Sequence, residues 1–249
     1  MIETYIAAAY WGAREESLEQ CTSRLFNFME CFTKLHHSFS TWLDVNAKGY
    51  KGYKAGVTRV LQINDVDEIR SLLLEDRATN DDGRVLEELG FSVFLTNKLN
   101  KEPGTSISVT CGCTVDGVPS CCVIDLPYGS GTGSEVLTTD VLTSIMNCLV
   151  SSWNPTWGIV QSGHYRRMIE PSSKQAAHIG WLTYLSKSYG TIPSLGNDIQ
   201  VQEMGQSGSL ITLTRERFTV SNPTHLQLAA HASSVLSEAG VLDPVTYST

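Results

Sequence analysis

The apolar positions at the start of the chain predict a buried strand followed by an amphipathic helix. Residues 5–11 are almost all apolar, and Gly12 interrupts them. Across residues 17–38, apolar side chains return every three or four positions, which places them along one face of a helix. This stripe consists of Leu18, Cys21, Leu25, Phe28, Met29, Phe32 and Leu35. Ser17 and Gln20 have the spacing of a capping box, in which each side chain bonds the backbone N–H of the other residue.

Further helices are predicted where a start signal precedes the same periodicity. We expect them over residues 65–73, 84–89, 138–154 and 222–240. Asp65 and Glu68 match a second capping box, and Gly90 is placed to end the short helix. The pair Asn222-Pro223 combines a capping residue with a proline in the first turn, where its missing N–H costs nothing.

Strand-like segments occur along the whole chain. They lie at residues 91–96, 107–115, 121–126, 157–160, 181–185, 199–203 and 210–214. In the second of these, apolar residues and cysteines alternate with small or polar residues, which is typical of a strand with one buried face. Asp116-Gly117 predicts a hairpin turn into the next strand. We therefore expect one α+β domain over residues 1–249, with helices packed on a largely antiparallel sheet, and a division near residues 163–174 as the alternative.

Charge, apolar runs and cysteines restrict the class of protein. The net charge of the 249 residues is −8, which argues against nucleic acid or anionic lipid as a direct ligand. No apolar run is long enough to span a bilayer, and the N-terminus lacks the basic and long apolar regions of a signal peptide. Seven scattered cysteines, an odd number, fit reduced thiols better than a disulfide framework. We expect a cytoplasmic protein without a membrane or nucleic-acid partner.

The negative charge is concentrated between residues 65 and 88. This segment holds nine acidic residues and three arginines, so it carries −6 and the remaining chain only −2. A run of acids on short helices is most often a solvated surface. The uneven distribution nevertheless predicts that a protein partner would be basic.

Glycine and cysteine patterns superficially suggest a ligand site. The stretch from Gly129 to Gly133 follows a predicted strand but lacks the Gly-Lys-Ser/Thr ending of a P-loop, so we interpret it as a surface loop. Four cysteines lie close together in sequence: Cys111, Cys113, Cys121 and Cys122. Structural zinc sites usually separate paired ligands by two to four residues, and adjacent residues of a strand point to opposite faces. We therefore expect buried thiols and no metal site.

Histidine and serine candidates for catalysis are equally weak. His36-His37 is expected at the end of the first long helix, where a positive charge favours the helix dipole, so a capping role is preferred over metal ligation. Ser162-Gly163-His164 lacks the pattern of a nucleophile elbow. We expect no catalytic residue, metal or cofactor. An enzyme that uses a cysteine, or Ser162 and His164, remains an alternative, as does a general protein-interaction domain.

Short stretches over nearly the whole chain form a characteristic combination. They are residues 5–21, Asp81-Asp82-Gly83 with Glu87 to Phe91, residues 123–127, Trp153 with Trp157-Gly158, residues 180–185 and 210–214, and Arg217-Phe218 with Ser221 to Pro223. Together they resemble the immunity protein 52 family of bacterial polymorphic-toxin systems, which include type VI secretion effectors. The resemblance implies an α+β antitoxin that catalyses no reaction and neutralises a secreted nuclease toxin of restriction-endonuclease-like fold. The loop from Lys48 to Gly56 and the cysteine-rich hairpin depart from the family pattern, so no role is carried over to them.

The implied partner directs attention to the acidic segment. A nuclease grips phosphates with basic residues, so an acidic surface on an inhibitor can occupy the phosphate positions and speed encounter. We predict that the partner-binding residues are Glu75, Asp76, Asp81, Asp82, Glu87 and Glu88, which surround the matched Asp81-Asp82-Gly83 turn. Binding beside the active site of the toxin and formation of a homodimer remain alternatives at this point.

Overall fold

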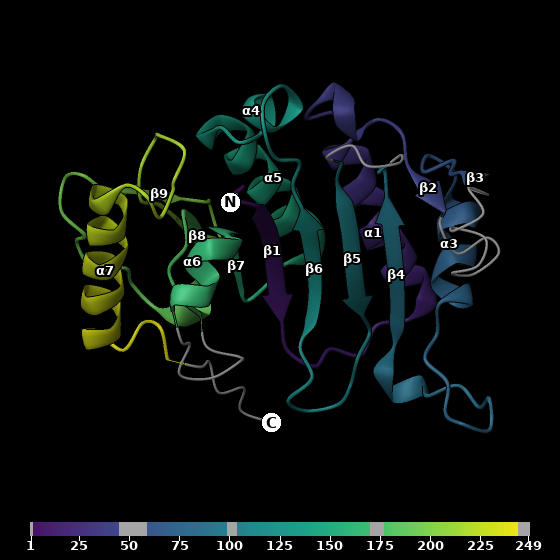
Figure 1. Cartoon of the computed structure of the whole chain (residues 1–249). Coiled ribbons are helices and arrows are strands. Elements are labelled where there is room, and N and C mark those ends of the chain that lie inside the picture. The colour runs from purple at the N-terminus through teal and green to yellow at the C-terminus, as the bar shows by residue number, and fades with distance from the viewer. Residues whose placement is uncertain (1, 45–58, 99–103, 170–176, 244–249) are drawn as a thin grey trace.

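One antiparallel sheet of ten strands runs through the described part of the chain (Figure 1). The structure is a computed structural model that describes residues 2–44, 59–98, 104–169 and 177–243. The strands follow the order β3-β2-β4-β5-β6-β1-β7-β8-β10-β9. They span Tyr5–Trp11 (β1), Leu43–Asp44 (β2), Arg59–Val60 (β3), Phe91–Thr96 (β4), Ser106–Cys111 (β5), Ser120–Asp125 (β6), Trp157–Ser162 (β7), Leu182–Ser186 (β8), Gln200–Glu203 (β9) and Gly208–Thr212 (β10). The predicted α+β class with a largely antiparallel sheet is confirmed.

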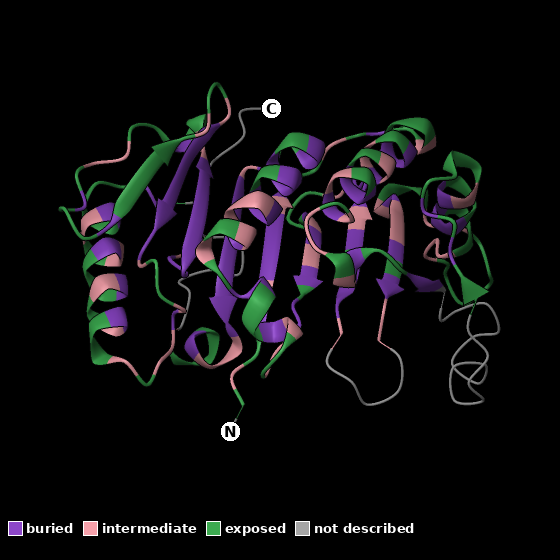
Figure 2. Cartoon of the chain, turned by 90° about the horizontal axis from the view of Figure 1, so that it is seen from above, coloured by how far each residue is buried: buried purple, intermediate pink, exposed green. Residues whose placement is uncertain are grey.

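Three helices cover one face of this sheet: α1 (Leu18–Phe32), α3 (Val66–Glu75) and α5 (Thr139–Trp153). Their buried residues point to the strands and their exposed residues to solvent (Figure 2). The helices α6 (Gly163–Met168) and α7 (Pro223–Glu238) lie on the opposite side, at the end of the sheet that holds β8 and β9 (Figure 1). Shorter elements are α4 (Thr132–Val136) and the 3₁₀ helices His37–Phe39 (η1), Glu87–Leu89 (η2) and Lys187–Tyr189 (η3). None of the described helices is long and apolar enough to cross a membrane.

Two sequence expectations fall on residues outside the described ranges. The loop from Lys48 to Gly56 is one of them. The other is the second half of the possible division near residues 163–174, because the description stops at 169 and resumes at 177. The strands on either side of that division, β7 and β8, are neighbours in the same sheet.

The central strand β1 is buried on both faces. Its residues Ala7, Ala8 and Ala9 are fully buried and pair with β6 on one side and β7 on the other. Trp11 stacks on Trp153 of α5, with ring centroids 5.2 Å apart. Since alanines are small, the helix packs close to the sheet at this point, and strands buried on both faces read as continuous apolar runs.

Helix α1 begins where the sequence predicts but ends earlier. The Ser17 hydroxyl accepts the Gln20 N–H at 3.3 Å and the Gln20 side chain accepts the Ser17 N–H at 2.8 Å, so the capping box is confirmed. The predicted extension to residue 38 is wrong, because the helix stops at Phe32 and His36 is extended, with φ −157°. The His36 ring caps η1 by accepting the Ser38 N–H at 3.2 Å. It therefore does not cap the C-terminus of α1 as expected.

Two other local predictions need correction. Asp65 caps α3 by accepting the Asp67 N–H at 2.9 Å, but Glu68 does not complete a capping box, because its carboxylate pairs with Arg59. The strand expected over residues 107–115 ends at Cys111, where Gly112 follows with φ +73°. A left-handed residue breaks strand geometry, so the second half of that segment belongs to the connection between β5 and β6.

A disulfide joins the two central helices, which corrects the expectation that all seven cysteines are reduced. Cys31 of α1 bonds Cys148 of α5, with the two Cα atoms 5.9 Å apart and a sequence separation of 117 residues. The remaining five cysteines are free thiols. The two partners become neighbours only because α1 packs beside α5, and nothing in their sequence spacing indicates this.

Breaking the Cys31–Cys148 bond should lower the free energy of unfolding by about 2–5 kcal/mol, because a bond that closes a long loop restricts the unfolded chain. In urea titrations, reductant should destabilise the wild-type protein and the Cys121→Ser control, which keeps the disulfide. Cys148→Ser should start from the lower stability and show no response to reductant. An oxidised wild type that unfolds at the same urea concentration as its reduced form would contradict this prediction.

Tyr5 ties the first strand to the C-terminal third of the chain. Its hydroxyl donates to the Phe218 carbonyl at 2.6 Å, and its ring packs edge-on against Trp181 at 6.0 Å. Burial, with the Glu3 carboxylate as a smaller cause, raises the pKa of Tyr5 to about 12. Burial also raises the pKa of Tyr184 to about 12. Both side chains therefore stay neutral in the folded protein well beyond the ordinary pKa of tyrosine.

Stability should fall as the pH rises from about 10 to about 12, because the unfolded chain loses its tyrosine protons first. The contribution of the two raised pKa values is fully present below about pH 10 and is lost as the pH passes through that window. Tyr5→Phe should cost about 1 kcal/mol at neutral pH, since the Phe218 carbonyl loses its donor, and should flatten the alkaline slope. Urea unfolding at several pH values measures both effects, and a slope equal to that of the wild type would refute the role of Tyr5.

Candidate partner-binding surface

The acids of residues 65–88 divide into two groups with different surroundings. Asp65 and Asp67 lie at the N-terminus of α3, where negative charge favours the helix dipole, and Glu68 pairs with Arg59. These acids support the fold. The second group comprises the six predicted partner-binding residues, all C-terminal to the buried part of α3: Glu75, Asp76, Asp81, Asp82, Glu87 and Glu88.

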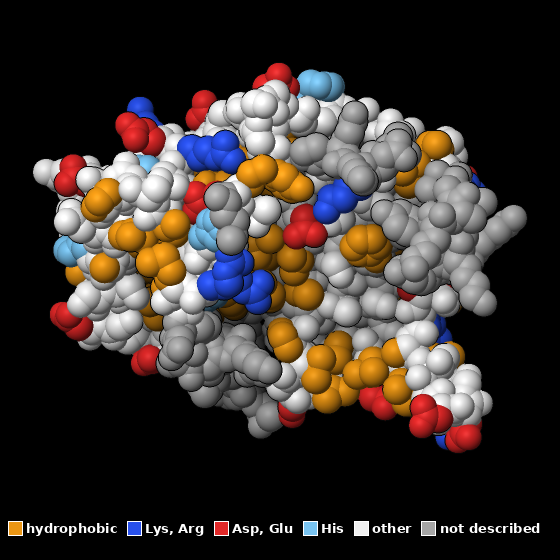
Figure 3. Space-filling view, in the orientation of Figure 1, with side chains coloured by type: hydrophobic (Ala, Val, Ile, Leu, Met, Phe, Trp, Pro, Cys, Tyr) orange, Lys and Arg blue, Asp and Glu red, His pale blue; other side chains and the backbone are white. Residues whose placement is uncertain are grey.

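An acidic hairpin, residues 78–86, projects from the molecule between α3 and β4 (Figures 1 and 3). The Asn80 N–H bonds the Arg84 carbonyl at 2.9 Å, and the Asn80 side chain accepts the N–H groups of Asp82 at 3.1 Å and Arg84 at 2.8 Å. These bonds form a closed turn with Asp81 and Asp82 exposed at its tip. The helix predicted over residues 84–89 is therefore wrong, because only its last three residues form a helix, the 3₁₀ helix η2.

The base of the acidic hairpin is anchored by Arg77. Its guanidinium lies over the Phe91 ring, 5.1 Å from the centroid, and it pairs with the Glu87 carboxylate at 2.5 Å. Glu87, one of the predicted partner-binding residues, is thus engaged in an internal ion pair. Within the described part of the chain, the carboxylates of Asp81 and Asp82 form no ion pair, and the backbone of their turn is held by the Asn80 side chain.

Glu75 and Asp76 lie at the C-terminal end of α3, away from the N-capping residue Asp65. Glu75 is the last residue of the helix and is exposed, and Asp76 is the C-cap and half-buried. Negative charge at a helix C-terminus is unfavourable, typically by about 0.3–1 kcal/mol for an exposed group. Helix stability therefore gives no reason for acids at these two positions. Glu88, in η2, is exposed, and its backbone carbonyl accepts the Thr114 N–H at 2.9 Å.

A second exposed surface is the face of β4, β5 and β6 that lies opposite α1. Phe94 is 43% exposed on this face, beside Ser108 of β5 in the register of the sheet. Val123 of β6 pairs with Ser108 and is half-buried. This surface is mixed in polarity and is separate from the acidic hairpin.

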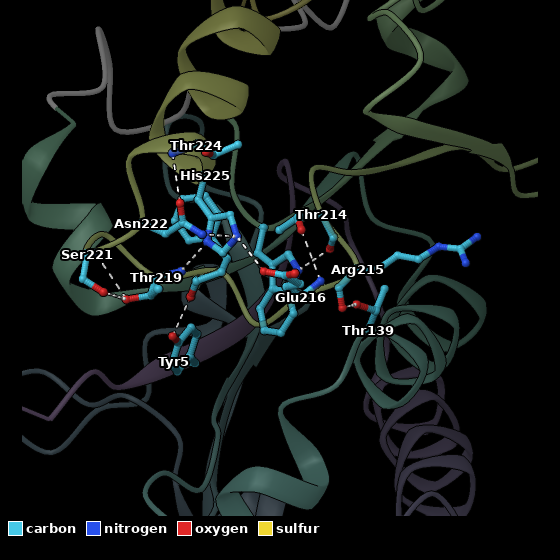
Figure 4. Close-up of polar contacts among 12 residues, drawn as sticks. Tyr5, Thr139, Thr214, Arg215, Glu216, Thr219, Ser221, Asn222, Thr224 and His225 are labelled. Carbon is cyan, nitrogen blue, oxygen red and sulfur yellow. Dashed lines mark hydrogen bonds and ion pairs between the residues drawn. The ribbon is translucent and has the colours of Figure 1, made fainter.

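Ser162, which was considered for catalysis together with His164, and the buried His225 serve the packing of the C-terminal part. The Ser162 hydroxyl is buried and caps α6 by accepting the Tyr165 N–H at 3.0 Å. His225 is 4% exposed, and its Nδ1 accepts the Thr219 N–H at 3.1 Å (Figure 4). The other ring nitrogen, Nε2, lies 3.1 Å from the Asn222 side-chain nitrogen and 3.7 Å from the Glu216 carboxylate. These contacts hold α7 in place.

The cysteines of the β5–β6 region are poor nucleophiles. Burial raises the pKa of the Cys121 and Cys122 thiols, and a hydrogen bond with Cys21, together with burial, raises the pKa of Cys111. Since the thiolate is the reactive form, these groups are protonated at neutral pH. Cys121 is also half-buried and contacts the Thr110 hydroxyl at 3.2 Å. The environment of the thiols is that of core residues.

One group of side chains was missed by sequence reasoning. His36 Nε2 lies 3.2 Å from Glu135 Oε2, and His37 adjoins them, so that one donor atom of each residue lies within 4.8 Å of the others. The sequence predicts a capping role for the dipeptide His36-His37, and Glu135 follows the glycine-rich stretch that the sequence predicts as a surface loop. No local spacing connects the two segments, since they meet only in the tertiary structure.

Comparisons with known proteins give a family and a related fold. A family model described as immunity protein 52 matches residues 3–245. Among solved structures, the chain is similar to a Pseudomonas aeruginosa protein described as T6SS protein PA0821, with a TM-score of 0.55 and 12% identity over 93% of this chain and 72% of that chain. At this identity the likeness concerns the fold alone. The curated proteins gave no significant match.

Proposed function

This chain belongs to the immunity protein 52 family, and we propose that it neutralises a secreted nuclease toxin of restriction-endonuclease-like fold by binding it, partly through the acidic hairpin. Membership implies an immunity protein with a cognate toxin. The nuclease activity of that toxin, its fold and the contact surface belong to the proposal. The proposed mode of action is binding alone, without catalysis or cofactor.

The observation that carries the proposal is the position of Asp81 and Asp82. Both are exposed at the tip of a turn that projects from the body of the protein (Figure 3). A nuclease cleft presents basic groups to phosphates, so two adjacent carboxylates on a projecting turn can reach those groups. Opposite charge also steers the encounter of two proteins and suppresses wrong partners.

Preorganisation of the hairpin supports the same role. The Asn80 side chain bonds two backbone N–H groups of the turn, and Arg77 fixes its base against Phe91 and Glu87. A segment that is already ordered loses less conformational entropy when it binds. The backbone that carries the two tip carboxylates is therefore ordered before the toxin arrives.

The hairpin is one part of a larger contact. A stable interface buries roughly 800 Å² on each partner, which exceeds the surface of a single turn. Glu75, Asp76 and Glu88 extend the acidic surface along the end of α3 and η2. We place the interaction in the cytoplasm, where a nuclease meets its substrate, although a disulfide such as Cys31–Cys148 is more typical of oxidising compartments.

The first expected result is stoichiometric inhibition. Plasmid cleavage by the nuclease domain encoded beside this gene, followed with Mg²⁺, should fall as the protein is added and should reach its minimum near one equivalent. A single tight site explains such a sharp end point. Undiminished cleavage at excess protein would exclude this toxin as the target and would remove the basis of the proposal.

The second expected result concerns the tip of the acidic hairpin. Asp81→Lys combined with Asp82→Lys should weaken toxin binding about 100-fold or more, because each reversal places a cation against a basic surface, and losses of about 2–5 kcal/mol are usual for close charge pairs. The matched control is Asp198→Lys with Glu238→Lys, which makes the same change in net charge at exposed positions near β9 and α7.

Isothermal titration of both variants against the same nuclease domain measures the difference. Urea unfolding of each variant shows whether its fold is retained. Equal affinity of the hairpin variant, the control and the wild type would exclude the acidic hairpin from the interface. Inhibition by that variant would then indicate contact through another surface, such as the face that carries Phe94.

A further inference from the structure

Two histidines and a glutamate meet at the end of α1. His36 and His37 follow this helix, and Glu135 comes from α4, almost one hundred residues later in the chain. The His36 Nε2 and Glu135 Oε2 atoms are 3.2 Å apart, and the donor atoms of all three residues lie within 4.8 Å of one another. The proposed binding of a toxin makes no use of this cluster.

The His36 ring is held in a defined position. Its side chain is 13% exposed, and its Nδ1 lies 2.8 Å from the Ser38 hydroxyl and 3.2 Å from the Ser38 N–H. The ring also packs against the His37 ring, with centroids 4.2 Å apart, and edge-on against Phe39 at 5.8 Å. Because these contacts involve Nδ1 and the ring faces, Nε2 is the atom directed at Glu135.

The glycine-rich stretch places Glu135 beside this ring. Helix α4 starts after Gly131, and its Gly133 lies against the backbone of Tyr128. A Cβ at Gly133 would come within 2.5 Å of the Tyr128 carbonyl carbon, so any other residue would push α4 away. Gly133 thus lets α4, the helix that carries Glu135, pack against the backbone of Tyr128.

We propose that His36, His37 and Glu135 bind a divalent first-row transition ion, with Zn²⁺ as the representative ion. Two imidazole nitrogens and one carboxylate oxygen are a ligand set that proteins use for zinc. Bond lengths of about 2.0–2.2 Å in a tetrahedral site place the donor atoms roughly 3.3–3.5 Å apart. The His36–Glu135 separation of 3.2 Å is close to that value. His37 is exposed, so its ring can rotate to bring the third donor closer.

The surroundings provide the other parts of such a site. When a metal occupies Nε2, the hydrogen of the neutral His36 ring moves to Nδ1, where the Ser38 hydroxyl at 2.8 Å can accept it, and the bond from the Ser38 N–H to Nδ1 is given up. Outer-shell partners of this kind orient the ligand ring. His37 and Thr132 line a cavity of about 300 Å³, from which water can supply the fourth ligand. A bound ion would connect the end of α1 to α4.

The test is titration of the full-length protein, treated with EDTA and dialysed, with ZnCl₂ in a calorimeter. We expect one equivalent of Zn²⁺ to bind with micromolar or tighter affinity and to raise Tm by mass action. His37→Ala and Glu135→Gln should each weaken Zn²⁺ binding by at least about tenfold. Loss of an outer-shell partner of a metal ligand already costs about that much, and loss of a direct ligand should cost more. His231→Ala and Glu238→Gln, both exposed residues of α7, are the matched controls and should bind as the wild type does.

Co²⁺ distinguishes this cluster from the free thiols. A site of nitrogen and oxygen donors gives visible d–d absorption without the intense near-ultraviolet band of a cobalt–thiolate bond. A strong thiolate band, Zn²⁺ binding that is unchanged in both ligand variants, or no binding at millimolar Zn²⁺ would each overturn the proposal. In the last case, the contact of His36 with Glu135 is a polar contact between two side chains and no metal site. Toxin inhibition is measured separately, so none of these outcomes bears on the proposed antitoxin role.

Discussion

The burial of β1 on both faces is the constraint on which the rest of the structure depends. Ala7 and Ala9 leave little side-chain bulk between the sheet and α5, so the helix packs directly on the central strand, while Ala8 points to the other face. The stacked pair Trp11 and Trp153 holds the two elements together at one end. At the other end, the Tyr5 hydroxyl reaches the segment before α7. Both halves of the sheet, with their different helices, are therefore built outward from one seven-residue strand.

The acidic segment shows how one stretch of sequence serves both the fold and a surface. Asp65 and Glu68 contribute to the start of α3 and to its contact with β3, where their charges are used internally. Asp81 and Asp82 lie where neither helix dipole nor ion pair accounts for them. Their turn is closed by Asn80 and its base is fixed by Arg77. Asn80 and Arg77 thus stabilise the acidic hairpin, and Asp81 and Asp82 are the residues that it exposes to solvent.

Local signals in the sequence succeeded where short-range bonds decide the structure. The caps at Ser17 and Asn222 are confirmed, and β4 has the predicted bounds. The two wrong helix predictions, residues 84–89 and the extension of the first helix to residue 38, also have local causes, but the spacing of apolar residues does not reveal them. The Asn80 side chain favours a closed turn over the helix expected at residues 84–89. Helix α1 ends at Phe32 with Thr33 as its C-cap, so Leu35, the last residue of the apolar stripe, lies outside the helix. The short elements β2, β3, α4 and α6 carry too few residues to show a period.

By itself, the sequence determined the α+β class, most helix and strand positions, the concentration of acids and the resemblance to a family that the family match confirms. Each of these depends on residue types within a few positions of one another. Only the tertiary structure decided that Cys31 meets Cys148 and that His36 meets Glu135. It also decided that Asp81 projects into solvent. The Cys31–Cys148 and His36–Glu135 contacts each join residues about one hundred positions apart. They arise from the order in which helices pack on the sheet, and no local pattern of residues encodes that order.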